Sequence, residues 1–162
     1  MKFATKVYAQ SPIWLQNLGI SAFGYTWQRR RFGGIFEPTL RGFKDRELFN
    51  KKQLEDYQTL QLRRLLVHAF ETVPHYHNAF NALGFNALNL EKFELKDLPK
   101  LPFLAKNTPR TLGTTDLVSQ KPEAQGCFFG SSGSTGTPTQ ILFSPAMHQR
   151  VSAATEARVR HW

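Results

Sequence analysis

Cysteine, long apolar runs and a secretory leader are what this chain of 162 residues has least of. Its single cysteine, Cys127, excludes an internal disulfide framework and a cysteine-based metal cluster, and is typical of a reducing compartment. No apolar run approaches the roughly 20 residues that a membrane-spanning helix needs. Residues 1–8 carry charge but lack the apolar stretch of about 7–15 residues found in secretory signals. We therefore expect a cytoplasmic protein.

Apolar and aromatic residues are plentiful. The hydrophobic fraction is 41%, with 14 phenylalanines, and this composition excludes a wholly disordered chain. A folded chain of this length can bury roughly 68–70% of the surface that it exposes when unfolded. We expect a sizeable core to which most of the phenylalanines contribute.

The net charge of +9 is unevenly distributed along the chain. Residues 1–52 hold ten Lys and Arg against three acidic residues, a net +7, whereas residues 53–162 hold eleven against nine, a net +2. This asymmetry divides the chain into a basic, aromatic segment (1–52) and a more neutral remainder (53–162). The basic segment fits an anionic partner, whether nucleic acid, lipid headgroups or an acidic protein face, and fits a solvated basic surface equally well.

Residues 12–32 mix aromatic, aliphatic and basic side chains. Ser11 can cap a helix that starts at Pro12, and Trp14, Leu15 and Leu18 then share one face. Such a helix can lie on an anionic membrane, or it can pack against its own domain. Three glycines argue against one long interfacial helix: Gly19, Gly24 and Gly33.

The middle of the chain is helical in pattern. Apolar residues of the segment 53–73 follow the spacing of one helix face: Leu62, Leu65, Leu66, Ala69 and Phe70. Pro74 opens a second helix that stops near Gly84. Two prolines within residues 98–103 predict an extended or turning segment there.

Strands and a further helix are predicted in the last third. Residues 125–129 and 140–143 have the pattern of short strands. Ser144 and Pro145 open a helix that the pattern carries to the last residue, Trp162. A domain seldom stops within an uncapped helix, so we expect the chain to be a fragment of a longer protein.

Between the two predicted strands lies a segment rich in glycine and hydroxyl groups. Its glycines let backbone N–H groups turn toward one point, and its hydroxyls can donate to phosphate oxygens. Flanking strands would hold its ends fixed, as a preorganised site requires. The candidate phosphate-binding residues are Ser131, Ser132, Gly133, Ser134, Thr135, Gly136 and Thr137.

Three other interpretations of this segment fit less well than a phosphate-binding loop, and a fourth, a purely structural turn, fits equally well. A Gly/Ser linker seldom sits between two strands, and a Walker loop requires a lysine that is missing here. A nucleophile elbow requires glycine where Ser134 stands. From composition alone, a phosphate cradle and a purely structural turn stay open. No catalytic pair can be drawn, and His75 and His77 lack a third metal ligand.

Residues 131–138 resemble the phosphate-binding signature of the adenylate-forming enzymes. More closely, they resemble the phenylacetate–coenzyme A ligase family and its capsule-biosynthesis branch, called CapK-like. The likeness extends upstream in the family's order. Residues 62–76 are similar to a helix-and-proline stretch of the family, residues 98–106 to the arm that follows, and residues 32–36 to the capsule branch.

The resemblance implies a mixed α/β fold, the N-terminal part of the adenylate-forming large domain, with a helical front end followed by the start of a sheet. It implies that ATP activates a carboxylic acid to an acyl-adenylate, which passes to a thiol such as CoA, with Mg²⁺ assisting. Residues 131–136 would hold the β- and γ-phosphates. Residues 53–162 would then be a truncated AMP-binding domain without adenylation activity of its own, and no nucleic acid is expected as a partner.

One departure from the family concerns a cation. Many members carry a lysine shortly after the second glycine, where this chain has Thr137 and Thr139. The substitutes to consider are Lys106, Arg110, Arg150, Arg158 and Arg160. A non-catalytic alternative also stays open, in which a basic module binds anionic membrane, at the inner membrane face, or nucleic acid through residues 1–52.

Overall fold

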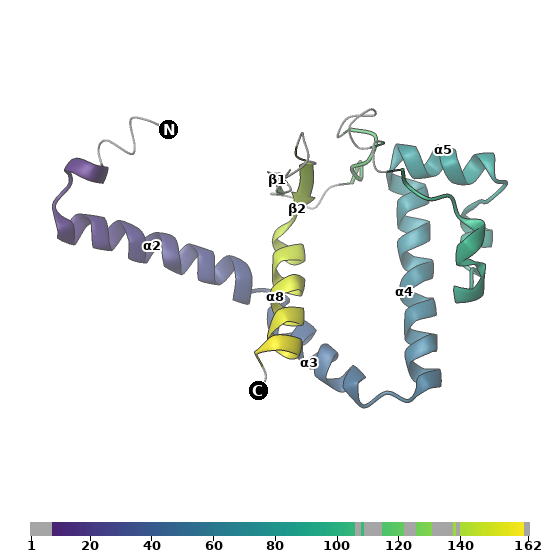
Figure 1. The fold of residues 1–162 in the computed structure, drawn as a ribbon, viewed down its shortest axis with the longest axis horizontal. Coiled ribbons are helices and arrows are strands. Elements are labelled where there is room, and N and C mark those ends of the chain that lie inside the picture. Colours follow the sequence, from purple (N-terminus) through teal and green to yellow (C-terminus); the bar gives the residue numbers. More distant parts are fainter. Residues whose placement is uncertain are drawn as a thin grey trace. The chain divides into compact units, whose positions relative to one another are not determined.

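The computed structural model describes residues 8–105, 108, 115–121, 126–130, 138 and 140–160 (Figure 1). Helices dominate, and two short strands form one antiparallel sheet, so the predicted mixed α/β class with a helical front end is confirmed. The elements are α2 (Ile13–Phe32), α3 (Phe36–Glu47), α4 (Lys51–Thr72), α5 (Pro74–Ala82), α6 (Ala87–Leu90), the 3₁₀ helix η1 (Leu95–Lys100), β1 (Cys127–Gly130), β2 (Gln140–Phe143) and α8 (Pro145–Val159).

The chain forms two compact units. The first unit combines Met1–Lys44 with Pro145–Trp162, and the second is Asp45–Ser144. The division predicted from charge, between residues 52 and 53, stays a prediction. Helix α4 begins at Lys51, two residues before the start that periodicity indicates.

Helix α2, in the first unit, differs from its prediction in two respects. Its N-cap is Pro12, which makes no side-chain capping bond, so the helix starts one residue later than Ser11 capping would place it. It also runs for 20 residues through Gly19 and Gly24, so the doubt that the glycines raised about one long helix here is wrong as to its length. Nothing lies within 4 Å of a Cβ built at either glycine, so both are ordinary, weakly unfavourable helix positions.

A glycine turn joins α2 to α3 and is held by α8. Gly34 has φ +53°, in the left-handed region that favours glycine, and a Cβ there would stand 2.7 Å from Gln149 Oε1. The backbone N–H of Ile35 donates to the same Gln149 oxygen at 3.0 Å. Helix α8 starts at Pro145, as predicted, but ends at Val159, so the expectation of a helix continuing to Trp162 is wrong.

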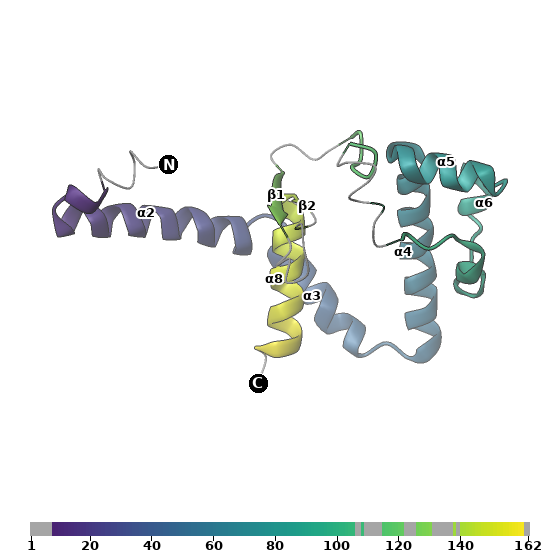
Figure 2. The same ribbon diagram turned by 45° about the horizontal axis from the view of Figure 1, so that its top comes forward.

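In the second unit, α4 carries the other helices. A capping box between Asn50 and Gln53 starts α4. Pro74 occupies the first turn of α5, as expected, and the chain reverses at Gly84, where φ is +78°. Both α5 and α6 pack against α4 (Figure 2).

The core of the second unit is a small apolar cluster of Leu66, Phe80, Leu90 and Phe93, each at most 6% exposed. The predicted apolar face of α4 is correct at Leu66 but wrong at Leu65, which is 62% exposed. The expectation that phenylalanines are mainly core is also only partly correct. Large fractions of these phenylalanine side chains are exposed: Phe23, Phe32, Phe49, Phe103, Phe128 and Phe129.

The segment after α6 is more regular than its prolines indicate. Residues 98–100 belong to η1 with Pro99 inside it, so the prediction of an extended or turning segment is wrong there; residues 102–105 have no regular structure. Farther on, Gln120 N donates to Thr72 O at 2.7 Å, and His75 N donates to Asp116 O at 3.0 Å. These two bonds attach residues 115–121 to the corner between α4 and α5.

Candidate functional site

Strands β1 and β2 are the two elements between which the candidate phosphate-binding segment lies (Figure 1). They pair antiparallel, with Cys127 opposite Phe143 at one end and Gly130 opposite Gln140 at the other. The prediction of two strands is confirmed, although β1 begins at Cys127, later than the predicted start at residue 125, and ends one residue later, at Gly130. Because Gly130 and Gln140 are paired, the chain is held together at the two positions that flank residues 131–139.

The hairpin is apolar on both faces. The alternation of a strand places Phe129 on the face of Phe143, and their rings meet edge to face with centroids 5.2 Å apart. Leu142 lies on the other face, close to Gly126. A Cβ built at Gly126 would stand 2.7 Å from Leu142 Cδ1. The cross-strand ring contact and the close packing at Gly126 together stabilise the pairing of β1 and β2.

All seven candidate residues, 131–137, lie outside the described residues. Their role as phosphate donors therefore stays a prediction. Among the described residues beside this segment, a Cβ at Gly130 would stand 3.3 Å from Pro138 Cβ, so Pro138 lies close to the last residue of β1.

The cation that would replace the missing lysine also stays open. Lys106 and Arg110 lie outside the described residues. Arg150 and Arg158 lie on α8 in the first unit, and Arg160 follows it within 3.7 Å of Glu156. Each remains a candidate.

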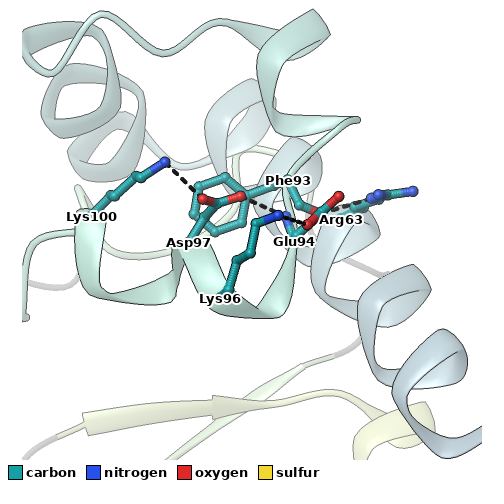
Figure 3. Close-up of polar contacts among 6 residues, drawn as sticks. All are labelled: Arg63, Phe93, Glu94, Lys96, Asp97 and Lys100. Atoms are coloured by element: carbon teal, nitrogen blue, oxygen red, sulfur yellow. Dashed lines mark hydrogen bonds and ion pairs between the residues drawn. The ribbon is translucent and has the colours of Figure 1, made fainter. Parts of the chain in front are cut away.

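A second polar cluster lies where α4 meets η1 (Figure 3). Arg63, on α4, donates through Nε to the carbonyl oxygen of Phe93 at 2.8 Å. Lys96 Nζ lies 2.6 Å from Glu94, and Lys100 Nζ lies 2.7 Å from Asp97. The backbone N–H of Glu94 donates to Asp97 Oδ2 at 3.2 Å, completing the start of η1. Figure 3 shows these side chains around one turn, with Arg63 reaching it from the neighbouring helix.

This cluster borders an open groove of about 580 Å³. The lysines and carboxylates of the cluster are paired. The hydrogen bond from Lys100 lowers the pKa of Asp97, and the backbone N–H of Glu94 lowers it further; the hydrogen bond to Glu94 raises the pKa of Lys96. Every one of these pKa changes favours the charged form. We conclude that Arg63 links α4 to Phe93, just before η1, and that the ion pairs within residues 94–100 offer neither a poised acid nor a poised base.

Two residues named in the sequence analysis, His77 and Cys127, are among the described residues. His77 has Nδ1 2.9 Å from Phe70 O and Nε2 2.9 Å from Asn81 Nδ2, so both ring nitrogens have partners. Cys127, in β1, is half-buried. Within the part of the chain that the structure describes, no three His, Cys, Asp or Glu side chains are grouped to hold a metal ion.

Two anchoring side chains escape sequence analysis, Gln149 and Arg63. Both bond to backbone groups far away in the sequence, 114 and 30 residues distant. The spacing of Glu94 and Asp97 is that of a capping box, a local signal that could have found the start of η1. No local pattern could have predicted that Arg63 bonds to Phe93 or that Gln149 bonds to Ile35.

Searches of known sequences connect this chain with one class of protein. It is 37% identical over 103 residues to a phenylacetate-coenzyme A ligase of Aromatoleum evansii, covering 62% of this chain and 23% of that protein. The ligase of Escherichia coli (strain K12) is 35% identical over 92 residues (57% and 21%). That of Thermus thermophilus is 30% identical over 110 residues (68% and 23%).

The chain spans less than a quarter of the length of these curated relatives. No protein-family model matches it, and no solved structure matches it. Among the helices that the structure describes, none is long and apolar enough to cross a membrane. The comparisons agree with the family resemblance found in the sequence, and leave its capsule branch without support.

Proposed function

We propose that this chain is part of an adenylate-forming ligase of the phenylacetate–coenzyme A ligase family, and that residues 131–137 are its phosphate-binding loop. The observation that carries the proposal is the similarity, at 30–37% identity, to proteins named phenylacetate-coenzyme A ligase. The β1–β2 hairpin supports it, because paired strands restrict a glycine- and hydroxyl-rich loop at both ends.

In the proposed reaction, the carboxylate of an acid attacks the α-phosphate of ATP. A P–O bond forms to the acid and the bond to the β-phosphate oxygen breaks, which gives an acyl-adenylate and pyrophosphate. A thiol such as CoA then takes the acyl group and AMP leaves. The loop's amides and hydroxyls would orient the β- and γ-phosphates and stabilise the charge that collects on the departing pyrophosphate.

A bound Mg²⁺ would supply neutralisation of the phosphate oxygens. The side chains of this chain do not by themselves form a Mg²⁺ site. The candidate loop offers only hydroxyl groups as side-chain ligands, and the described residues contain no group of three His, Cys, Asp or Glu side chains that could hold a metal ion. We therefore assign no metal ligand in this chain. ATP, Mg²⁺ and CoA belong to the proposal through the family.

The finer assignment is to the capsule-biosynthesis branch. Its support is the resemblance of residues 32–36, the turn in which Gly34 lies against Gln149. A cytoplasmic location accompanies the assignment. We further propose that the 162-residue chain alone lacks adenylation activity, because it spans under a quarter of each matched ligase. Pyrophosphate exchange into ATP with candidate acids should stay at background, and robust exchange would contradict this.

The loop is tested by nucleotide binding to the 162-residue chain. Isothermal titration with ATP should detect weak binding that the double substitution Ser134→Ala/Thr135→Ala reduces at least tenfold, since two hydrogen-bond donors to a charged phosphate are lost. Thr115→Ala, an exposed hydroxyl of the same unit, is the matched control and should bind as the parent does. Equal affinity in all three proteins would overturn the loop assignment.

A further inference from the structure

The first unit holds almost all of the chain's net charge. Met1–Lys44 and Pro145–Trp162 together contain ten Lys and Arg against two acidic residues, a net +8. Asp45–Ser144 contains eleven against ten, a net +1. The division by folded unit is therefore sharper than the division by sequence, because three arginines of the C-terminal helical region join the basic N-terminal segment.

Helix α2 of this unit exposes apolar side chains along its whole length. It has no buried residue, and only Gln16, Arg30 and Arg31 are as much as half-buried. The exposed large apolar residues of this helix are Ile13, Trp14, Leu15, Leu18, Ile20, Phe23, Tyr25, Trp27 and Phe32. A soluble monomer rarely leaves so many large apolar side chains of one helix in water without a binding function.

One face of α2 points away from α8, the helix that α2 contacts most. Trp27 and Arg31, four residues apart, contact α8 through His148 and Ser152. At 100° per residue, Trp14, Leu18 and Tyr25 lie within about 40° of one another and well away from Trp27 and Arg31. These three side chains are 67%, 60% and 61% exposed.

Basic groups accompany this open face. Arg29 lies on the same side by helical spacing, with its Cζ 6.0 Å from the Tyr25 ring centroid. Arg29, Arg30 and Arg31 all fall in the last turn of α2. Trp and Tyr prefer the headgroup level of a bilayer, and arginine pairs with anionic headgroups, so this combination has the chemistry of a membrane interface.

We propose that α2 lies in the surface of an anionic lipid bilayer, with Trp14, Leu18 and Tyr25 inserted among the headgroups and the +8 of the unit opposite the lipid charge. The helix is about 30 Å long and has three consecutive arginines, so it lies along the surface and does not cross. This face favours lipid over nucleic acid, because contacts to a phosphate backbone are made by charged and polar groups and do not bury exposed Trp and Leu side chains.

The experiment is co-sedimentation of the 162-residue chain with vesicles of phosphatidylcholine alone, and of phosphatidylcholine with about one third phosphatidylglycerol. Binding to the anionic vesicles should exceed binding to the neutral ones at least tenfold and weaken at high salt. Trp14→Ala/Leu18→Ala should reduce it at least tenfold, through lost apolar insertion. Arg29→Gln should reduce it about fivefold.

Matched controls come from the second unit. Leu88→Ala/Phe103→Ala removes a leucine and an aromatic ring that are 70% and 100% exposed, and Arg64→Gln removes an exposed arginine. Both controls should bind as the parent does. Absence of binding, equal loss in the controls, tighter binding to duplex DNA than to anionic vesicles, or a dimer dissociated by Trp14→Ala/Leu18→Ala would each overturn the proposal. The ligase reaction has no part in this test.

Discussion

The two units have interiors of different kinds. In the second, Leu66, Phe80, Leu90 and Phe93 form an apolar cluster of large side chains. In the first, apart from Phe36, the buried residues are small or polar: Gln149, Ser152, Ala153 and Ala157. The second unit is therefore stabilised mainly by apolar burial, whereas the first depends on close approach to α8 and on individual hydrogen bonds. Substitutions that remove volume should damage the second unit most, and those that disturb backbone approach should damage the first.

The largest effect is expected in the apolar cluster. Leu90 is fully buried, and Leu90→Ala should lower the free energy of opening of the second unit by about 3 kcal/mol, because it leaves a cavity. Hydrogen exchange at the amides of α4 and α5 measures this. Leu88, two residues away and 70% exposed, is the control; an equally large effect of Leu88→Ala would show that burial in the cluster does not stabilise the unit.

A pair of glycines in the first unit should respond with opposite signs. Gly34→Ala should destabilise that unit by about 2 kcal/mol, since its φ is +53° and a Cβ would stand 2.7 Å from Gln149 Oε1. Gly24→Ala should stabilise it by about 0.5–1 kcal/mol, since nothing lies near that position in α2. Hydrogen exchange in α3 and in α2 reports each change. A neutral Gly34→Ala would break the claim that α8 determines this turn.

Loss of the Gln149 side chain should cost less. Gln149→Ala removes the acceptor of the Ile35 N–H and should destabilise the first unit by about 1 kcal/mol. Gln58, exposed on α4, is the matched control, and Gln58→Ala should change little. The two variants are compared by exchange at the amides of α8. If they behave alike, the hydrogen bond to the turn contributes nothing measurable.

The smallest effect concerns pH. Burial lowers the pKa of His148 below its ordinary 6.5, and the charges of Arg30 and Arg31 add to this. The unfolded chain then binds a proton more readily than the folded one, so the first unit should keep full stability above pH 6.5 and lose some as pH falls from there. Exchange at α8 against pH should show this slope. His148→Gln should remove it, and an unchanged slope would assign it to another group.

The local signals in the sequence predicted local structure well. Pro74 at a helix start, Gly84 at a reversal and the hydrophobic strand at 140–143 all lie where their physical preferences put them. Errors arose where one residue's preference was taken to decide a whole segment. Gly19 and Gly24 lie within α2 with nothing within 4 Å of a Cβ built at either, and Pro99 lies inside η1.

Around the candidate site, too, the local features were predictable from the sequence and the long-range contacts were not. Apolar strands on both sides of a glycine-rich loop are readable from the sequence, and the register of Gly130 against Gln140 confirms that they pair. The role of Gln149 could not be predicted, because its partner Ile35 is 114 residues away and the bond exists only once α8 packs beside the turn. The exposure of Trp14 and Leu18 could not be predicted either, because it depends on which face of α2 packs against α8.

The most direct test of the loop's role is the amide spectrum of the ¹⁵N-labelled chain, recorded with ATP and with adenosine. If the loop binds phosphate through its backbone, the amide signals of Gly133, Ser134, Thr135 and Gly136 shift with ATP and stay in place with adenosine, while those of α4 do not change. Unshifted loop signals at saturating ATP, or the same shifts with adenosine, would contradict the account.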